Sequence, residues 1–292
     1  MRISDSDLII NSSGEIYHLG IKPEQLAETI ITVGDPERVK RVSKHFNSIE
    51  YESHHREFIV CTGTHHGNRI TVLSTGMGTQ NIDIVMAELD ALVNIDFATR
   101  TVNEEKKRLR IIRIGTSGAI QPDINVGSII ISKYAVDLTG MLLFYSYSQT
   151  QAEQQLGESF SLFMKNKMPD IPIPAFEASK VLAEMFCESG ECIDGITATC
   201  NGFYAPQGRK MRIMPKYPSL LDDLMAYQAP FLRMTNFEME TAGYYGLGRV
   251  YAHDCCSINK IIANRPRGIF TKNLVQDEDA LIEFVLNTLE PL

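Results

Sequence analysis

Short apolar runs alternate along the chain with longer segments in which apolar residues recur every three or four positions. This alternation is typical of α/β proteins, in which buried strands are connected by amphipathic helices. The apolar runs predict strands at 29–33, 70–74, 111–115, 127–132, 195–199 and 257–263. The periodic segments predict helices at 37–46, 82–93, 175–187, 237–247 and 277–289. The charged interval 100–110 predicts an exposed connector.

The composition is that of a globular protein with a large core. Of 292 residues, 44% are hydrophobic and 22% are charged. Because no linker rich in Pro, Gly or Ser divides the chain, we expect one domain over residues 1–292. No apolar run approaches the roughly 20 residues of a membrane span, and the N-terminus lacks a signal-peptide pattern. The sequence therefore predicts a cytoplasmic protein without a membrane partner.

Charge and cysteine content narrow the class further. The 28 basic and 36 acidic residues give a net charge of −8, which argues against a nucleic-acid partner but not against a small anion held by a few arginines. None of the six cysteines lies in a C-x-x-C pair. A metal site or a redox pair is one interpretation, and we favour the other, buried free thiols in a reducing compartment.

Three turns rich in glycine and hydroxyl groups follow predicted strands. They are Gly34-Asp35-Pro36, Gly76-Met77-Gly78-Thr79 and Gly115-Thr116-Ser117-Gly118. Ligands of open α/β sheets bind at the carboxyl ends of strands, where backbone N–H groups of such turns can approach an anion. The chain has neither G-x-G-x-x-G nor G-x-x-x-x-G-K-[ST], so dinucleotide and P-loop sites lose their main support.

Two arginines indicate what the turns could bind. Arg113 lies inside an apolar strand, and Arg38 lies one turn into the first predicted helix. A buried guanidinium group is costly unless an anion or an internal carboxylate pairs with it. The two arginines beside the turns predict a phosphate site. Guanidinium groups locked to internal carboxylates would instead indicate structural ion pairs.

An ordered set of motifs now resembles the nucleoside phosphorylases of the uridine phosphorylase type. The motifs follow one another from residue 17 to residue 265, so the resemblance covers most of the chain. They are Tyr17-His18-Leu19-Gly20, Gly34-Asp35-Pro36-Glu37-Arg38-Val39, Arg56-Glu57-Phe58, Ser74-Thr75-Gly76-Met77-Gly78, residues 112–122, residues 203–209, residues 236–241 and Asn264-Arg265. The resemblance implies a single-domain, three-layer α/β/α fold with a central mixed β-sheet flanked by helices.

The resemblance also implies a role for each matching residue. The phosphate-binding residues would be Gly34, Arg38, Arg113 and Thr116, with Arg56 supplied by a neighbouring subunit. The ribose-binding residues would be Glu238, Met239 and Glu240, with His18 reaching across the interface. The base-binding residues would be Phe203, Gln207 and Arg209, with Arg265 behind them. Among these, the catalytic work is expected of Arg113, Gln207 and Arg209.

The implied reaction is the reversible phosphorolysis of uridine to uracil and ribose 1-phosphate. Inorganic phosphate is then a co-substrate, and no organic cofactor or catalytic metal is expected. An interface cation near Glu57, Met77 and Asn81 is in doubt, because Asn81 stands where the family has a serine. A homodimer is the minimum that the borrowed His18 and Arg56 require. A homohexamer stays open, because the connector 95–110 is longer than in compact hexameric members.

The choice of base depends on fewer residues. Asn264 stands where hexameric purine phosphorylases have an aspartate, which together with Gln207 and Arg209 favours a pyrimidine. The alternatives are a purine phosphorylase, a hydrolytic nucleosidase and a catalytically silent nucleoside-binding protein. The sequence leaves the tolerance for thymidine or deoxyuridine open.

Overall fold

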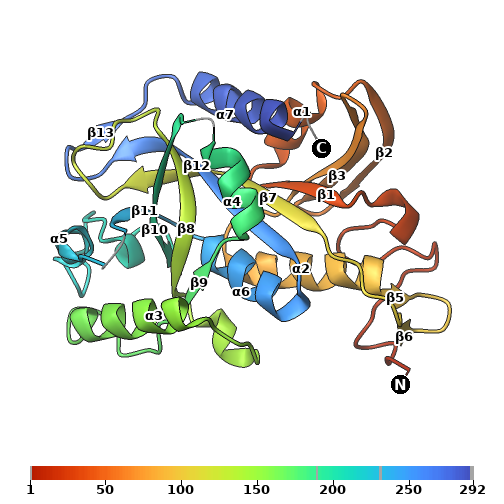
Figure 1. Cartoon of the computed structure of the whole chain (residues 1–292), viewed down its shortest axis with the longest axis horizontal. Coiled ribbons are helices and arrows are strands. Elements are labelled where there is room, and N and C mark those ends of the chain that lie inside the picture. The colour runs from red at the N-terminus through yellow and green to blue at the C-terminus, as the bar shows by residue number, and fades with distance from the viewer. Residues whose placement is uncertain (1, 189, 230–231, 290–292) are drawn as a thin grey trace.

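The computed structural model of the chain describes residues 2–188, 190–229 and 232–289 (Figure 1). Its strands are β1 (Thr29–Val33), β2 (Ser48–His55), β3 (Phe58–His65), β4 (Asn68–Ser74), β5 (Ile95–Asp96), β6 (Thr101–Val102), β7 (Arg110–Ala119), β8 (Ile129–Leu138), β9 (Ala175–Glu177), β10 (Cys192–Cys200), β11 (Met234–Glu238), β12 (Asp254–Asn264) and β13 (Ile269–Phe270). Its α-helices are α1 (Pro36–Ser43), α2 (Thr79–Asn94), α3 (Gln151–Met164), α4 (Lys180–Cys187), α5 (Leu220–Ala226), α6 (Thr241–Tyr251) and α7 (Leu274–Leu289). Short 3-10 turns are η1 (Pro23–Gln25), η2 (Met141–Phe144) and η3 (Ala205–Gln207).

One mixed sheet runs through the structure, in the order β13-β12-β8-β10-β11-β7-β1-β4-β3-β2. Strand β12 also pairs with β7, in parallel, so β7, β12, β8, β10 and β11 close into a ring. The strands β1, β4, β3 and β2 extend the sheet from this ring as an open arm. The ring is a feature that the apolar pattern did not predict, because periodicity does not reveal which strands pair.

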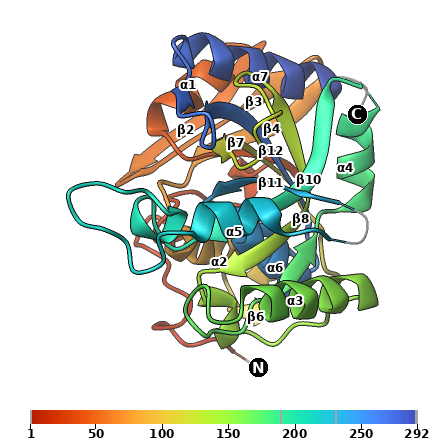
Figure 2. The same ribbon diagram turned by 90° about the vertical axis from the view of Figure 1, so that its left-hand side faces the viewer.

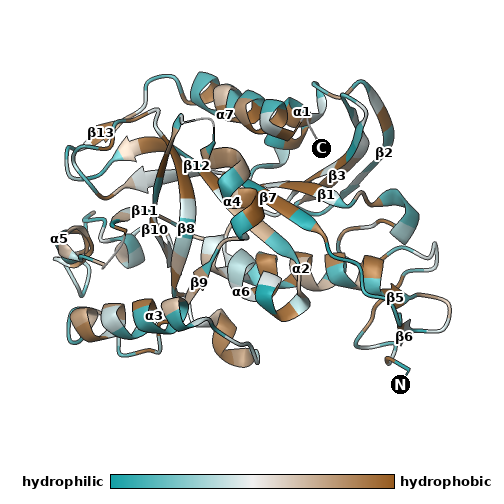
Figure 3. Ribbon diagram, viewed as in Figure 1, coloured by the Kyte–Doolittle hydropathy of each residue, from teal (hydrophilic) through white to brown (hydrophobic). Residues whose placement is uncertain are grey.

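Helices cover the sheet on two sides, which confirms the predicted three-layer arrangement. Helices α1, α4 and α7 lie on one side, and α2, α3 and α6 lie on the other (Figures 1 and 2). All five residues of β1 are buried. In Figure 3 the apolar colour runs along β1 and β7 in the middle of the molecule, whereas the outer helix α3 has mixed colours. The apolar core therefore lies between the sheet and its helical layers.

Most predicted elements have counterparts, and two predicted helices are wrong at their first residues. The strand predicted at 29–33 is β1 with the same bounds. Residues 175–177 form β9 rather than the start of a helix, because they pair with β8. Phe237 and Glu238 end β11, which pairs with β7 and β10, so the following helix begins at Thr241. The hairpin of β2 and β3 and the helix α3 were not predicted.

The prediction of buried cysteines holds for four of the six. Cys61, Cys200, Cys255 and Cys256 are buried, and Cys187 and Cys192 are half-buried. None of the helices in the described part of the chain has the length and apolar character that a bilayer crossing requires.

Candidate active site

A cavity of about 470 Å³ opens at the carboxyl ends of β1, β4, β7, β11 and β12. All three glycine-rich turns reach it, so the predicted grouping of these turns is confirmed. It also has an apolar component from Phe237, Ile262, Ala263 and Phe270. The predicted site residues that line it are Gly34, Arg38, Met77, Arg113, Thr116, Phe203, Gln207, Arg209, Glu238, Met239 and Glu240.

Local chain chemistry shapes the turns. The side chain of Asp35 accepts a hydrogen bond from the backbone N–H of Glu37 at 3.0 Å, so Asp35 caps α1 as its position before Pro36 predicts. Gly78 has a φ of 94°, a left-handed conformation that disfavours any residue with a Cβ atom. This conformation allows the N–H of Gly78 to donate to Glu240 Oε1 at 2.7 Å. The turn after β4 is thereby tied to the start of α6.

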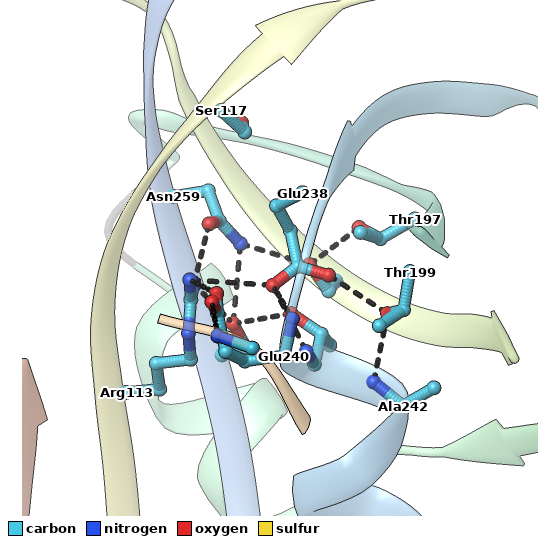
Figure 4. Close-up of polar contacts among 12 residues, drawn as sticks. Arg113, Ser117, Thr197, Thr199, Glu238, Glu240, Ala242 and Asn259 are labelled. Atoms are coloured by element: carbon cyan, nitrogen blue, oxygen red, sulfur yellow. Dashed lines mark hydrogen bonds and ion pairs between the residues drawn. The ribbon is translucent and has the colours of Figure 1, made fainter. Parts of the chain in front are cut away.

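Arg113 is buried at the centre of a polar network (Figure 4). Its Nη2 lies 2.5 Å from Glu240 Oε2 and 3.2 Å from Glu238 Oε2. Its Nη1 donates to Asn259 Oδ1 at 2.8 Å. Burial by itself lowers the pKa of Arg113, but the two carboxylates outweigh burial and hold the pKa above its ordinary value. Arg113 therefore stays charged and joins β7 to both glutamates.

Glu238, at the end of β11, holds the backbone at the start of α6 and uses most of its acceptor capacity to do so. Its Oε2 accepts from the backbone N–H groups of Glu240 and Thr241 at 2.7 and 2.9 Å. Its Oε1 accepts from the Thr199 hydroxyl at 2.7 Å. A carboxylate offers about four acceptor positions, so about one remains on Oε1, and Arg113 forms an ion pair with Oε2 at 3.2 Å. The side chain of Glu238 thus positions the start of the helix, where a negative charge is favourable.

Glu240 differs from Glu238 in that it keeps more acceptor capacity. Its two oxygens accept one bond each, from Gly78 and Arg113. With about four positions on a carboxylate, about two remain for another donor. Burial raises the pKa of Glu240, Arg113 lowers it, and the charge of Glu238 adds to the rise, so the pKa lies above its ordinary value.

Arg38 is buried beside the cavity, and an internal carboxylate pairs with it. Its Nη2 donates to Glu278 on α7, and its Nη1 approaches the carbonyl oxygen of Ile114 at 3.5 Å. Its Nε is buried and has no hydrogen-bond partner among the described residues. For Arg38 and Arg113 alike, the structure contains the internal ion pair that the sequence left open as an alternative. Their binding of phosphate therefore stays a proposal.

The opposite end of the cavity carries positive charge without a carboxylate. Arg209 Nη1 donates to Gln207 Oε1 at 2.6 Å, and its guanidinium carbon lies 3.5 Å from the centre of the Phe203 ring. Burial, and next the charge of Arg265, lower the pKa of Arg209 to about 10, which leaves it charged at neutral pH. Arg265 Nη1 donates to the carbonyl oxygen of Gln207 at 3.2 Å, so it braces the pocket from behind, as expected. In the part of the chain that the structure describes, no carboxylate pairs with either arginine.

The comparisons with known proteins agree with this geometry. The family model described as the phosphorylase superfamily matches residues 28–288. The chain belongs to the phosphorylase superfamily. It is 33% identical to a uridine phosphorylase of Thermococcus kodakarensis over 263 residues, which cover 89% of this chain and 81% of that protein. A uridine phosphorylase of Salmonella typhimurium is 27% identical over 79% of each chain. A Trypanosoma brucei nucleoside phosphorylase that shows uridine phosphorylase activity superposes with a TM-score of 0.90 at 25% identity, covering 98% of this chain and 100% of that chain.

Two predicted residues of this superfamily member lie outside its own cavity. His18 Nδ1 is 2.6 Å from Glu88 Oε1, and His18 is half-buried. Arg56 lies at the turn between β2 and β3 and donates to the Tyr17 hydroxyl at 3.2 Å. The Tyr17 and His18 rings are in contact, with their centres 4.8 Å apart, so both predicted residues belong to one surface cluster. Neither residue is among the described residues that line the cavity.

Asn264 and Asn81, two residues that the sequence analysis singled out, make contacts of their own in this superfamily member. Asn264 does not line the cavity, because its Nδ2 donates to the carbonyl oxygens of Gln121 and Ile124 at 3.0 and 2.7 Å. The inference about base choice from Asn264 therefore has no direct geometric support. Asn81 Nδ2 donates to Glu57 Oε1 at 3.3 Å. Because the Asn81 amide also carries a carbonyl oxygen, this contact does not decide the expected interface cation near Glu57, Met77 and Asn81, which stays a prediction.

Some residues that line the cavity, or that contact a lining residue, have no sequence signal that would have marked them. Phe270 and Ile262 read as ordinary apolar residues. Glu278 lies in an acidic start of a helix, where carboxylates are common, and is 240 positions from its partner Arg38. The spacing along the chain does not reveal this contact.

Proposed function

We propose that this chain is a uridine phosphorylase, which converts uridine and phosphate reversibly into uracil and ribose 1-phosphate. One observation carries the proposal. A single cavity gathers two arginines beside glycine-rich turns, a carboxylate with spare acceptor capacity and an amide–guanidinium pair. These three groups match the chemistry of a phosphate, a ribose and a pyrimidine base. The uridine phosphorylases among the relatives of the chain support the same substrates.

Phosphate would bind between Arg38, Arg113 and the turns at Gly34 and Thr116. One phosphate oxygen forms the new bond to C1′ while the bond from C1′ to the base nitrogen breaks and leaves its electron pair on the base. The transition state places positive charge on the ribose, and the phosphate dianion is both nucleophile and counter-charge. Holding it in line beneath C1′ is a proximity effect that can lower the barrier by several kcal/mol.

The base would leave toward Arg209 and Gln207. Negative charge develops on the uracil oxygens as the bond breaks, and Arg209 can donate to that charge more strongly than to the neutral substrate. The amide of Gln207 can donate and accept at the same edge of the base. Phe203 offers an aromatic ring that is 49% exposed, with the Arg209 guanidinium group stacked over it.

The ribose would lie over Glu240. About two free acceptor positions on this carboxylate match the 2′- and 3′-hydroxyls. A substrate without the 2′-hydroxyl would leave one of these positions unpaired, which disfavours deoxyribonucleosides. Met239 would line the same side of the sugar. Glu238 would line the sugar beside it with about one acceptor position, because its other three bonds hold Thr199 and the start of α6.

The functional unit would be a homodimer at least. His18 and Arg56 lie together at the surface, and we assign them to the cavity of a neighbouring subunit. The proposal needs no organic cofactor, because phosphate itself supplies the nucleophile. A cytoplasmic location is part of the proposal and rests on the sequence alone.

One chromatographic assay tests the proposal with uridine, inosine and thymidine as substrates, each with and without phosphate. We expect uracil from uridine only when phosphate is present, together with ribose 1-phosphate. Uracil release without phosphate would indicate a hydrolytic nucleosidase. Turnover of inosine but not uridine would indicate a purine phosphorylase. Binding of uridine without any turnover would indicate a silent nucleoside-binding protein.

A further inference from the structure

We infer that Glu278, on helix α7, is a positioning residue that holds Arg38 in place for phosphate. The inference rests on the proposed function, because it concerns the phosphate end of the same cavity. Glu278 does not line the cavity itself, so it would act only through Arg38.

Glu278 bridges two arginines of one helix. One carboxylate oxygen accepts from Arg38 Nη2 and the other accepts from Arg41 Nη1. Arg41 is in turn fixed by Asp279 Oδ1, which its Nε meets at 3.0 Å, and by the carbonyl oxygen of Val275 at 2.6 Å. The carboxylate of Glu278 is therefore held from a second side and cannot swing freely with Arg38.

The contact leaves part of Arg38 available to a ligand. The guanidinium group is pinned at Nη2, while Nε is buried without a partner. A buried N–H group that lacks an acceptor is costly, so this arrangement is stabilised by any acceptor that reaches it from the cavity. An oxyanion beside Gly34 would be such an acceptor. Glu278 thus fixes one part of the arginine and leaves another part unsatisfied beside the cavity.

The burial of Glu278 makes the contact more than a surface ion pair. Glu278 is 7% exposed, like Arg38, whereas Asp279 is half-buried at the rim of the same helix contact. Both acidic residues bind Arg41 and so join α7 to α1, but only Glu278 reaches Arg38. Asp279 is therefore a matched control for the loss of the helix contact without the loss of the Arg38 contact.

The test compares E278Q with D279N in the full chain by steady-state kinetics with phosphate and uridine varied separately. We expect E278Q to raise the KM for phosphate about tenfold, the size of effect of one lost charge-assisted hydrogen bond. The KM for uridine should change less than about twofold, because the base and ribose ends do not touch Glu278. D279N should leave both KM values within about twofold of wild type while lowering Tm, since it weakens only the helix contact.

A second variant covers poor folding of E278Q. E278D keeps the negative charge but is too short to reach both arginines, so we expect a smaller, equally selective rise in the KM for phosphate. An unchanged KM for phosphate in E278Q or E278D would overturn the inference. A lower KM would overturn it too, because it would show that Glu278 competes with phosphate for Arg38.

The proposed function and this inference can fail separately. If wild type releases no uracil in the presence of phosphate, the proposed function fails. Calorimetric titration of wild type, E278Q and D279N with inorganic phosphate then still tests Glu278: weaker binding in E278Q alone supports the inference, and equal binding in all three overturns it. If wild type is active but E278Q and D279N behave alike, only the inference fails.

Discussion

The two ends of the cavity differ in whether carboxylates pair with their arginines. At the phosphate and ribose end, Arg113 and Arg38 are buried and each has internal carboxylate partners. At the base end, Arg209 and Arg265 share a half-buried pocket in which, across the described ranges, no acidic side chain pairs with them. At the phosphate and ribose end, internal carboxylates neutralise the arginines. At the base end, the described part of the chain provides no carboxylate partner, so the positive charge is not neutralised.

This difference indicates which charges belong to the fold and which belong to the chemistry. Removing one partner of a buried ion pair strongly destabilises the fold, because the other charge is then left buried without a partner. A guanidinium group without a carboxylate partner lowers the stability of the fold slightly, and it forms an ion pair only when an anion binds. The base end is therefore suited to a leaving group that becomes negative in the transition state.

The largest effect is expected for R113M, which removes a buried positive charge at the phosphate and ribose end of the cavity. It leaves Glu238 and Glu240 buried without their common partner, so the free energy of unfolding should fall by about 3–5 kcal/mol. Chemical denaturation measures this. R233M is the control, because Arg233 forms an exposed pair with Asp123 and should contribute less than about 1 kcal/mol. Equal losses in the two variants would show that the network at Arg113 has no special role in stability.

R209A removes a guanidinium group at the base end of the cavity and should lower activity without a comparable loss of stability. We expect kcat/KM for uridine to fall by about 10²–10³-fold, the range for a lost donor to a developing anion. The free energy of unfolding should change by less than about 1 kcal/mol, because no buried carboxylate loses its partner. R212A, an exposed position of the same loop, is the kinetic control. An unchanged kcat/KM in R209A would remove it from the base pocket.

G115A should displace side chains at the phosphate and ribose end of the cavity without removing any charge. A Cβ atom at Gly115 would lie 1.8 Å from Arg113 Nη1 and 2.6 Å from Asn259 Oδ1, so these two side chains would have to move apart. We expect a loss of about 1–3 kcal/mol in the free energy of unfolding, the usual cost of overpacking. G118A in the same strand is the comparison, since its Cβ atom would lie 3.2 Å from Phe237 and needs a smaller shift. Similar Tm values for the two variants would contradict the assigned geometry of Arg113.

The smallest effect is a pH dependence of stability from Glu240. Because burial raises its pKa, Glu240 holds its proton more tightly in the folded chain than in the unfolded chain. Its contribution to stability is therefore greatest at low pH and is lost as pH rises from the ordinary carboxyl value through the raised pKa. Relative to E240Q, wild type should gain free energy of unfolding as the pH falls from about 8 to about 5. A constant difference between the two proteins across this range would indicate that Glu240 has an ordinary pKa.

Local chemistry explains what the sequence predicted well. The β-branched run at β1 gives no competing helical pattern, and Asp35 before Pro36 marks the start of α1. The hairpin of β2 and β3 was missed because β2 is largely exposed and polar, so it has no apolar run. Helix α3 did carry a signal, since Thr150 and Glu153 form a capping box before it.

The partners of the charged groups could not be predicted in the same way. The apolar surroundings of Arg113 showed that it needs a partner, but not that Glu238 at the end of β11 and Glu240 before α6 provide it. Both residues were expected within one helix over 237–247. The link between Arg38 and Glu278 depends on α7 packing beside α1, a tertiary contact between distant parts of the chain. The resemblance indicated which positions form the site. The hydrogen-bond and ion-pair partners of each residue depend on tertiary contacts, which the sequence does not reveal.

The ring of strands has a consequence for synthesis of the chain. Strand β7 ends at Ala119 and its partner β12 begins only at Asp254, so β7 is synthesised long before β12. Until β12 arrives, β7 lacks one neighbour and Arg113 lacks Asn259. Contacts this distant in sequence close late and slow folding. Until β12 has been made, a nascent chain therefore exposes apolar surface of β7 that the finished fold buries, and such surface is prone to aggregation.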